Sequence, residues 1–474
     1  MKRTVAFVAG VAAALLACLS ASAGAAPPQD PFDTEKLRPP SPSSAWLASS
    51  TSAPCDPARD LPALITLVDA IDQALCRNPR TRESWAAAKV AAAQIGAAQS
   101  ATLPGVTSTV SAQSSDSRNA INSGRRDQLT GSLSFNYLLF DFGGRSAAIE
   151  QARQSLLSAN WTHNATLQAV VLDTAQAYFQ LFASDQAVEA TQAAEKLALQ
   201  SLEATRARQK AGTATRADVL QAQTAHSQAQ LNRTQAEGDA AVARGTLSYA
   251  MGLRANAMPR LAPPADVDPH AIGDSAVAAL MDEALKRRPE LRAAEANIAA
   301  ARSAVTVEQS AGKPSVSLFA TPSLGVVNPG ADPRSLSVGV TLSIPIFTGY
   351  QNTYRIQAAR ESVDRNAATR DRLRNDVSLE VWRSYQDVRT QGQALTTAGD
   401  LVRSATESYD VALGRYRAGV GNVIDLLAAQ NALVQANIQR IQAQLRLNVS
   451  KVALARAIGV LEPSLFADAG AAAR

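Results

Sequence analysis

The residues of this sequence best placed to do chemistry are two aspartates, Asp218 and Asp425, which end two similar charged segments. The segments cover residues 208–218 and 415–425, and each contains an arginine, an Ala-Gly pair and the final aspartate at the same spacing. A carboxylate in this setting can cap the first turn of a helix. Copies of it can also meet in a symmetric assembly and form a ring that attracts cations.

Helix capping alone accounts for both aspartates. Gly212 and Gly419 suit the end of a helix, because glycine readily adopts the left-handed backbone conformation found there. Thr215 and Asn422 each stand three residues before an aspartate, which is the spacing of a helix N-cap followed by an acid in the first turn. A ring of carboxylates is a second role for Asp425 that is compatible with the cap, and it requires an oligomer.

Signals of enzymatic chemistry are nearly absent from the sequence. The histidines His163, His226 and His270 lie far apart in unlike contexts, and there is no glycine-rich phosphate loop, CxxC pair or nucleophile elbow. We therefore predict no catalytic residue, no cofactor and no metal site within one chain. The 46 Lys+Arg and 41 Asp+Glu residues are dispersed, so a pI of about 9.2 gives little reason to expect nucleic acid as a partner.

The two charged segments belong to an internal repeat that covers most of the chain. Asp72 recurs as Asp282 at an offset of 210 residues, and Tyr178 recurs as Tyr385 at an offset of 207 residues. Solenoid modules repeat every 20 to 50 residues, so this is a duplicated half-structure. Such a duplication favours a pseudo-symmetric tube, ring or membrane assembly. The predicted repeats are residues 63–262 and 263–461, and a tail of residues 462–474 follows.

Each repeat is predicted to contain a very long helix and a return helix. Residues 145–208 hold no proline or glycine, and at 1.5 Å per residue such a helix could span roughly 95 Å. The corresponding helix is predicted at residues 351–415, and the return helices at 215–251 and 422–458. A coiled-coil seam marks the second return helix, while alanines recur every seven residues in the first. The seam residues are Leu427, Val434, Ile438, Ile441, Leu445 and Val452, and the alanines are Ala222, Ala229, Ala236, Ala243 and Ala250.

A two-residue period marks one β-hairpin per repeat, predicted at residues 105–140 and 315–345 with loops at 114–126 and 325–333. One face of such strands is apolar and the other small and polar, as a transmembrane barrel requires. A half-buried sheet of a soluble domain shows the same alternation. In the last strand we expect Val338, Val340 and Leu342 to face lipid, and Ser337, Gly339 and Thr341 to face the lumen.

The N-terminus has the features of a secretory signal peptide, predicted at residues 1–25. Cys18 lies in a sequence similar to a lipobox and is either a lipidation site or a cysteine removed with the signal. An extended leader follows at residues 26–62, rich in Pro, Ser and Ala. Cys55 and Cys76 remain in an oxidising compartment, so a disulfide between them is favoured over two free thiols.

The order of these elements resembles the TolC family of outer-membrane export ducts, from Leu67 to Leu461. The resemblance rests on the Asn-Pro break at residues 78–79, the Leu-Pro pair at 103–104, the Phe-Asp-Phe-Gly-Gly corner at 140–144 and the doubled Ala-Gly turns. It implies a mainly α fold with a transmembrane β-barrel: a homotrimer with a barrel of twelve strands, four from each protomer. Its helical periplasmic tunnel would be closed at the far end until an inner-membrane partner engages.

Within this family the chain is most similar to components of type I secretion systems. That similarity implies a passive duct in the outer membrane of a Gram-negative bacterium. Its partners would be a periplasmic adaptor (membrane fusion protein) and an inner-membrane ABC transporter, and its cargo a protein toxin of the adenylate cyclase-haemolysin kind (cyclolysin). The alternatives are the outer channel of a multidrug efflux pump and, from a different class, a periplasmic coiled-coil scaffold without a pore.

The resemblance also identifies candidate gate residues, with two departures. Asp425 takes the place of one acidic ring residue, but Ala428 stands one turn further on where the family can have a second acid. Gly421 replaces an arginine of the network that closes the gate in this family. Of the remaining candidates, Tyr416 and Asp218 match positions of that network, and Arg216 or Arg417 would supply the missing arginine.

Overall fold

The structure is a computed structural model that describes residues 30–37, 62–118, 123–257, 260–263, 277–328 and 330–461. The signal peptide, Cys18, most of the leader and the C-terminal tail lie outside the described residues. The chain divides into two compact units, and each draws on both repeats. The first unit comprises Met1–Arg38, Ala87–Ala159 and Ala293–Thr369, and the second comprises Pro39–Ala86, Asn160–Arg292 and Arg370–Arg474.

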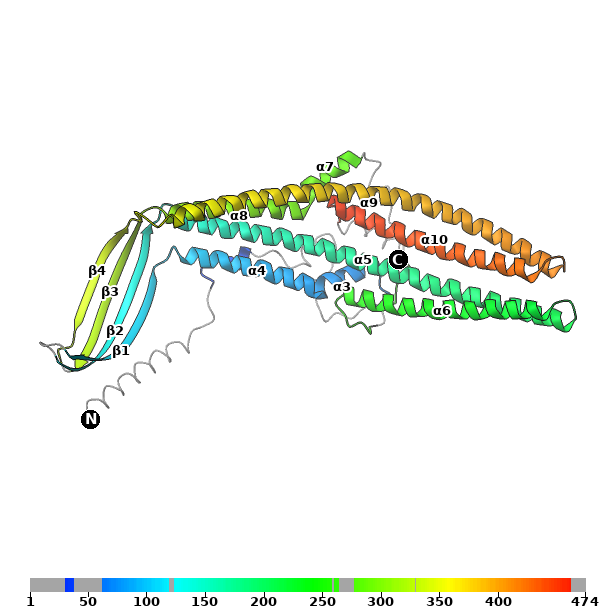
Figure 1. Cartoon of the computed structure of the whole chain (residues 1–474), viewed down its shortest axis with the longest axis horizontal. Coiled ribbons are helices and arrows are strands. Elements are labelled where there is room, and N and C mark those ends of the chain that lie inside the picture. Colours follow the sequence, from blue (N-terminus) through cyan, green and yellow to red (C-terminus); the bar gives the residue numbers. More distant parts are fainter. Residues whose placement is uncertain are drawn as a thin grey trace. The chain divides into compact units, whose positions relative to one another are not determined.

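The first unit contains one antiparallel sheet with the strand order β1-β2-β3-β4 (Figure 1). Each repeat supplies one hairpin, and the two hairpins join where β2 pairs with β3. Among the strands that the structure describes, β1 and β4 are at the edges, and each has one side without a partner strand. The strands are β1 (Gly105–Arg118), β2 (Ser123–Phe140), β3 (Ser315–Asn328) and β4 (Arg334–Ser343).

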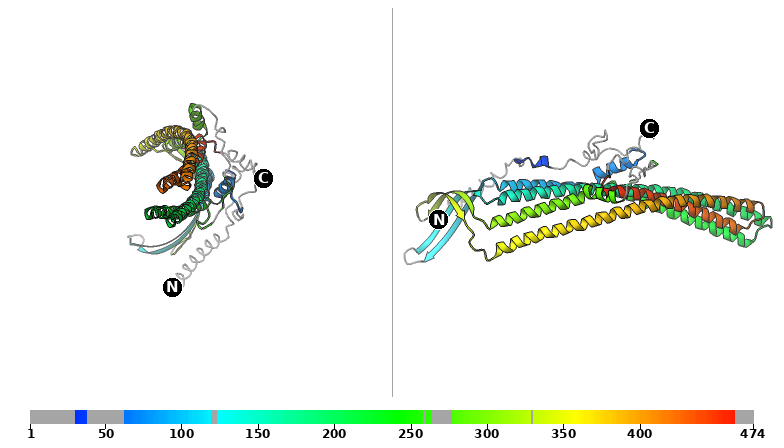
Figure 2. Two further views of the ribbon diagram at one scale, coloured as in Figure 1. Left: turned by 90° about the vertical axis from the view of Figure 1, so that its right-hand side faces the viewer. Right: turned by 90° about the horizontal axis from the view of Figure 1, so that it is seen from above.

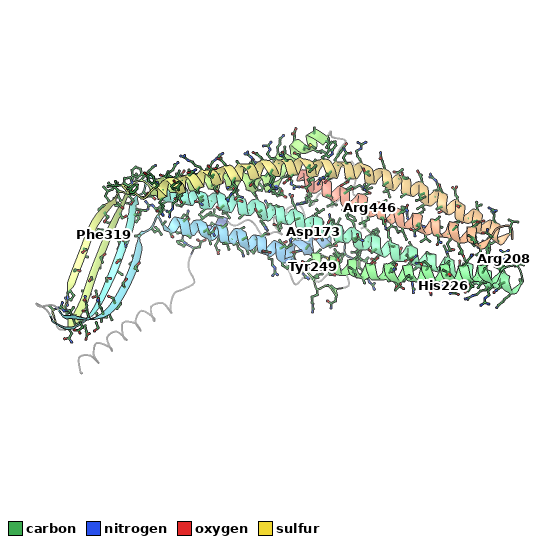
Figure 3. All side chains as sticks on the ribbon, in the orientation of Figure 1. Asp173, Arg208, His226, Tyr249, Phe319 and Arg446 are labelled. Atoms are coloured by element: carbon green, nitrogen blue, oxygen red, sulfur yellow. The ribbon has the colours of Figure 1, made fainter. Side chains whose placement is uncertain are left out.

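The two faces of this sheet differ in chemistry. Because side chains alternate along a strand, β4 presents Leu336, Val338, Val340 and Leu342 on one face, and all four are exposed in the protomer. The other face carries serine, threonine and glycine, with one aromatic ring: Phe319 (Figure 3) lies opposite Gly339, where a Cβ would come within 2.9 Å of the ring. The prediction of one apolar and one small, polar face is confirmed.

The strands are longer than the sequence indicated, and the prediction of loops at residues 114–126 and 325–333 is wrong. β1 and β2 remain paired out to Arg118 and Ser123, and β3 continues to Asn328. The alternation that marks a strand stops where polar residues follow one another, as at Ser114-Ser115-Asp116. The backbone ladder does not require apolar side chains, so it continues beyond the point where the pattern fades.

The two longest helices have the same length and occupy equivalent places in the repeats. These are α5 (Gly144–Lys210) and α9 (Gln351–Arg417), each of 67 residues. The return helices are α6 (Arg216–Ala250) and α10 (Val423–Ile458). In the second unit these helices lie side by side in the order α9, α10, α5, α6 (Figures 1 and 2). In the part of the chain that the structure describes, no helix is both long and apolar enough to span a membrane.

Shorter helices precede each hairpin in both repeats. A break before proline separates α3 (Leu67–Arg77) from α4 (Pro79–Ser100), and α7 (Val277–Arg287) from α8 (Pro289–Ala311). The residue before a proline is biased away from helical geometry, and Asn78 accordingly has an extended ψ of 127°. A short 3-10 helix, η1 (Thr34–Leu37), lies in the first unit. The prediction of a mainly helical fold with four strands and a two-fold internal repeat is confirmed.

The core of the second unit joins the start of the first repeat to its end. Ile65 and Leu261 form a parallel β-bridge, and the fully buried Tyr178 donates a hydrogen bond to the main-chain carbonyl of Ala262 at 2.6 Å. Burial raises the pKa of Tyr178, so the hydroxyl stays protonated and serves as a donor. Cys76 on α3 is disulfide-bonded. Its predicted partner, Cys55, lies outside the described residues, so the pairing stays a prediction.

Candidate functional site

The turns that join α5 to α6 and α9 to α10 have the same backbone structure. Gly212 and Gly419 adopt left-handed conformations, with φ of +77° and +82°. The amide after each glycine donates a hydrogen bond to a carbonyl in the last turn of the preceding helix, as in a Schellman motif. These bonds run from Thr213 to Arg208 at 2.9 Å and from Val420 to Arg415 at 3.1 Å. Glycine therefore ends both long helices, as predicted.

The first turn leads into a complete capping box. The Thr215 hydroxyl oxygen accepts a hydrogen bond from the Asp218 amide at 3.2 Å, and the Asp218 carboxylate accepts one from the Thr215 amide at 2.8 Å. The Thr215 hydroxyl also donates to that carboxylate at 2.8 Å. The bond from the main-chain amide, followed by the bond from the hydroxyl, lowers the pKa of Asp218. This carboxylate is thus occupied by the helix cap.

The second turn has a helix cap but no capping box. Asn422 accepts the amide of Asp425 through its side-chain oxygen at 2.7 Å. The Asp425 side chain is exposed, and among the residues that the structure describes none donates a hydrogen bond to its carboxylate. Both predicted N-caps are therefore present, but only Asp218 uses its carboxylate in one. The Asp425 carboxylate is therefore not used by the helix cap.

Tyr416 connects the end of α9 to α5. Its side chain is 6% exposed, and its hydroxyl lies 3.0 Å from the hydroxyl of Thr205. The guanidinium of Arg208 (Figure 3) donates to the main-chain carbonyl of Tyr416 at 2.7 Å and lies over its ring, 4.5 Å from the centre. Sequence reasoning did not identify Thr205 or Arg208 as contacts of Tyr416. The sequence held one signal that could have drawn attention to Arg208, which is that Arg208 and Arg415 occupy equivalent places in the repeat.

A second buried polar contact joins α5 to α10 next to Tyr416. The amide of Gln430 donates to the carbonyl of Ala194 at 3.4 Å, and the Ser201 hydroxyl donates to the Gln430 side-chain oxygen at 3.3 Å. Gln430 is buried, so these bonds satisfy polar atoms that would otherwise be costly to remove from water. Together with Tyr416, they fasten the α9–α10 hairpin to α5 within one chain.

The structure separates some of the residues that the sequence analysis grouped together. Within one protomer, Asp218 binds Thr215 whereas Tyr416 binds Thr205, and no described contact joins Asp218 to Tyr416. Arg216 and Arg417 are exposed, and in the described part of the chain neither forms a hydrogen bond or an ion pair. Their predicted role in place of the missing arginine therefore requires a partner outside the protomer.

The two histidines that the structure describes lie in different surroundings. His163 is buried with Nδ1 2.8 Å from the hydroxyl of Ser84, and burial lowers its pKa. His226 is half-buried on α6, and His270 lies outside the described residues. Among the described residues, no group of three or more His, Cys, Asp or Glu side chains could hold a metal ion. His163 therefore reads as a packing residue.

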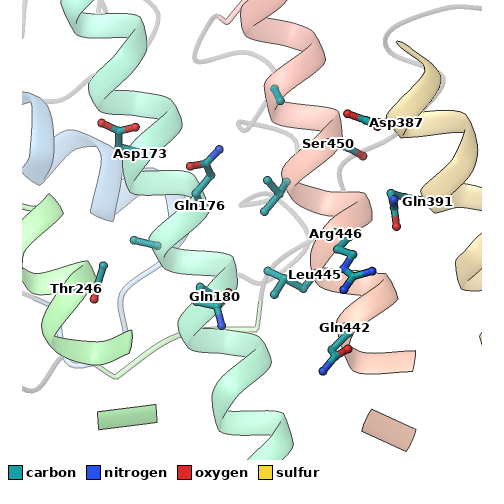
Figure 4. Close-up of a pocket in the computed structure, with 13 residues that line it drawn as sticks. Asp173, Gln176, Gln180, Thr246, Asp387, Gln391, Gln442, Leu445, Arg446 and Ser450 are labelled. Carbon is teal, nitrogen blue, oxygen red and sulfur yellow. The ribbon is translucent and has the colours of Figure 1, made fainter. Parts of the chain in front are cut away.

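A groove of about 950 Å³ lies between α5 and α10 in the second unit (Figure 4). Its walls carry charges of both signs from Asp173, Asp387 and Arg446, and Asp173 is paired with Arg80 at 2.7 Å. Small-molecule sites are usually enclosed. This groove is open to solvent, which suits contact with water or with another surface more than enclosure of a small molecule.

Comparison with known proteins places both repeats in one family of sequences. A family model described as "Outer membrane efflux protein" matches residues 70–253 and 280–460. Protein CyaE of Bordetella pertussis is 32% identical over 87% of this chain and 88% of its own. The probable efflux pump outer membrane protein TtgC of Pseudomonas putida is 27% identical over 71% of this chain and 70% of its own. The outer-membrane channel OprN has a similar solved structure, with a TM-score of 0.73, 22% identity, and coverage of 87% of this chain and 95% of its own.

Proposed function

We propose, from the premise that this chain belongs to the outer membrane efflux protein family and is an outer-membrane efflux or secretion channel, that it is the export duct of a type I secretion system. One observation carries this choice. The sequence resembles type I secretion components, and its identity to protein CyaE is higher and extends over more of the chain than its identity to the efflux pump protein TtgC. The proposed cargo is a protein toxin of the adenylate cyclase-haemolysin kind.

The unpaired edges of the sheet support assembly into a closed barrel. Within the described strands, β1 and β4 each leave one row of backbone groups without a partner strand. A bilayer offers no water to satisfy such groups, so a membrane-spanning sheet has to close on itself. We propose that three copies do this together and form a barrel of twelve strands, with β4 of one copy beside β1 of the next. The apolar face would then contact lipid and the serine- and threonine-rich face would line the lumen.

Two neighbouring substitutions test which face meets lipid. Val340 and Thr341 are adjacent on β4, and their side chains point to opposite faces. Val340→Arg should reduce the amount of assembled protein in outer-membrane fractions, because a charge at the middle of the bilayer costs about 2–4 kcal/mol. Thr341→Arg should assemble and change single-channel conductance. Equal yields of assembled protein from both variants would contradict the assignment of the two faces.

The proposed duct is passive and depends on partners for energy and cargo choice. The helix turns of the second unit carry no catalytic arrangement; their ordered features are caps, inter-helix hydrogen bonds and the free carboxylate of Asp425. Such features suit an aperture that opens and closes. The proposed partners are a periplasmic adaptor and an inner-membrane ABC transporter, which would bring the cargo to the turns.

An export assay tests the proposed function. A strain that lacks its own outer duct but holds a type I ABC transporter, adaptor and toxin should release toxin into the medium when this gene is supplied. The matched control is Val340→Arg, which keeps every soluble element but should not assemble in the membrane. Toxin that stays inside cells despite assembled wild-type protein would contradict the proposal.

The second candidate function is the outer channel of a multidrug efflux pump. Several relatives of this chain from Pseudomonas putida are named efflux pump outer membrane proteins, which favours this function. Drug susceptibility of a pump strain that lacks its outer channel separates the two functions. Restored resistance without toxin release would favour efflux. A scaffold without a pore would restore neither, and it would leave the membrane on washing with carbonate.

A further inference from the structure

A small cavity lies between α5, α9 and α10 in the second unit, close to the ends of the two long helices. It measures about 310 Å³ and is less open to solvent than the groove between α5 and α10. Cavities that bind small molecules measure about 300–1,000 Å³. Its size therefore suits a small molecule, and the proposed duct makes no use of it.

Part of the cavity wall is apolar. Leu197 of α5, Leu413 of α9 and Leu426 of α10 line it, together with the side chain of Tyr409. Leu426 is 1% exposed and Tyr409 is 8% exposed, and both belong to the cluster of buried apolar residues near the α9–α10 turn. An apolar body placed against this wall would be removed from water together with the wall, which favours binding.

The polar part of the wall carries two positive charges. Arg208 and Arg417 line the cavity, and among the described lining residues there is no carboxylate. Arg208 (Figure 3) donates to the carbonyl of Tyr416 through one nitrogen, which leaves other N–H groups of its guanidinium available. Arg417 forms no hydrogen bond or ion pair with a described residue. The cavity thus offers donors for an anion and no competing acid.

The hydroxyl of Tyr409 is a further donor. No described residue forms a hydrogen bond with it, although the side chain is buried. Burial raises the pKa of Tyr409 against the opposing effect of the Arg417 charge, and the charge of the exposed Asp410 raises it further. The hydroxyl therefore stays protonated and can donate to an acceptor in the cavity.

We propose that this cavity binds a small organic anion, whose carboxylate is held by Arg208, Arg417 and the hydroxyl of Tyr409. Its apolar body lies against Leu197, Leu413 and Leu426. A planar guanidinium can bind a carboxylate through two parallel N–H bonds, so arginine suits this ligand better than lysine does. The site goes beyond the proposed export function, because it lies between helices of one chain and requires no cargo, adaptor or second copy.

The two arginines also have a structural role, which leaves the cavity unexplained. Both stand in the last turn of a long helix, where a positive charge is favourable next to the helix dipole. Arg208 also caps the end of α9 through the carbonyl of Tyr416. Neither role requires both guanidinium groups to line one cavity with an unpaired tyrosine hydroxyl. A bound anion would balance this local excess of positive charge.

An anion in the cavity would contact α5, α9 and α10 at once. A ligand that binds the folded chain and not the unfolded chain stabilises the folded chain. The melting temperature of the purified protein should therefore rise with the concentration of such an anion.

Isothermal titration calorimetry of the purified protein in lipid nanodiscs tests the site, with naphthoate as the probe. Naphthoate carries a carboxylate on a flat apolar body, and naphthalenemethanol has the same body without the charge. Naphthoate should bind at least about tenfold more tightly, because the alcohol lacks the charge-assisted hydrogen bonds. Empty nanodiscs measure uptake of either compound by the lipid. Equal affinities for the two compounds, or no binding beyond that of empty nanodiscs, would overturn the inference.

Two arginine variants locate the bound anion. Arg417→Gln should weaken naphthoate binding about tenfold, and it should fold normally because Arg417 is exposed and has no described partner. The matched control is Arg415→Gln, which removes the same charge from the same helix end but does not alter the cavity lining. This control should leave binding nearly unchanged. Equal weakening by both variants would mean that the general positive charge of the turn attracts the anion, and would also overturn the inference.

Discussion

The α5–α6 turn and the α9–α10 turn share one backbone but use their side chains differently. Both end a 67-residue helix with a left-handed glycine and start the next helix with an N-cap. In the first turn the carboxylate of Asp218 closes the capping box, whereas in the second turn Asn422 makes the cap and the carboxylate of Asp425 stays free. Duplication has preserved the backbone geometry, and the acid in the second turn has become available for another role.

The same contrast occurs where each repeat breaks before a proline. In the first repeat the amide of Asn78 donates to the carbonyl of Ala250 at 2.9 Å. In the second repeat Arg288 takes the place of Asn78, donates to the carbonyl of Arg456 at 3.1 Å and pairs with Glu380 at 2.7 Å. A neutral contact in one half thus corresponds to a buried ionic contact in the other, on the same backbone.

Removal of the ionic contact should have the largest effect on stability. Arg288→Ala leaves Glu290 and Glu380 with Arg456 as their remaining cationic partner. Both carboxylates are partly exposed, so the loss should lie near the lower end of the about 3–5 kcal/mol that breaking a buried ion pair costs. Asn78→Ala removes two neutral hydrogen bonds, one to the Ala250 carbonyl and one from the Arg80 amide, which together should cost about 1–2 kcal/mol. Denaturant unfolding of the purified protein, followed by circular dichroism, measures both. Equal losses from the two variants would contradict the contrast between the repeats.

Acid should destabilise the first repeat through His163. Burial lowers the pKa of this side chain from 6.5, so below that pH the unfolded chain takes up the proton more readily than the folded chain. Stability should therefore be complete above pH 6.5 and decrease as the pH falls through and below it. The equivalent residue of the second repeat is Arg370, which is paired with Asp371 at 2.7 Å.

The pH dependence of thermal unfolding checks this expectation. The melting temperature of the wild-type protein should fall between pH 7.5 and pH 5.5, and that of His163→Gln should change much less over the same range. The glutamine side chain can hydrogen-bond with the Ser84 hydroxyl in the place of the imidazole, so packing and hydrogen bonding are largely kept. An unchanged pH dependence in His163→Gln would assign the acid effect to other groups.

The smallest expected stability effect concerns the two aspartates. Asp218→Ala removes the acid of a capping box and should cost about 0.5 kcal/mol. Asp425→Ala should cost less, because the acceptor in the second cap is Asn422 and not the aspartate. Thermal unfolding of the two variants beside the wild type provides the measurement. A larger loss from Asp425→Ala would show that its carboxylate supports the fold.

Local patterns in the sequence predicted most of the fold. The alternation at Leu336 to Leu342 indicated strands, the absence of proline and glycine indicated the long helices, and Thr215 with Asp218 indicated a cap. These features depend on neighbours within a few residues. The strand ends were predicted poorly, because pairing continues through polar residues that carry no alternating pattern.

The site contacts were harder to predict, since they join residues far apart in the chain. Arg208 reaches the carbonyl of Tyr416 across 208 residues, and Arg288 reaches Glu380 across 92. Neither pairing leaves a local signal. The difference between Asp218 and Asp425 was also hidden, because threonine and asparagine are both good N-cap residues. Only at Thr215 does the carboxylate of the following aspartate accept a hydrogen bond from the amide of the cap residue.

We propose that the aperture of this channel lies at the helix turns, with Asp425 facing the pore. Single-channel current in planar bilayers, measured with a multivalent cation on the side of the turns, tests it most directly. Wild-type and Asp218→Ala channels should be blocked, because three converging carboxylates bind hard cations, while Asp425→Ala trimers should conduct with much weaker block. Unchanged block in assembled Asp425→Ala trimers would contradict this account of the aperture.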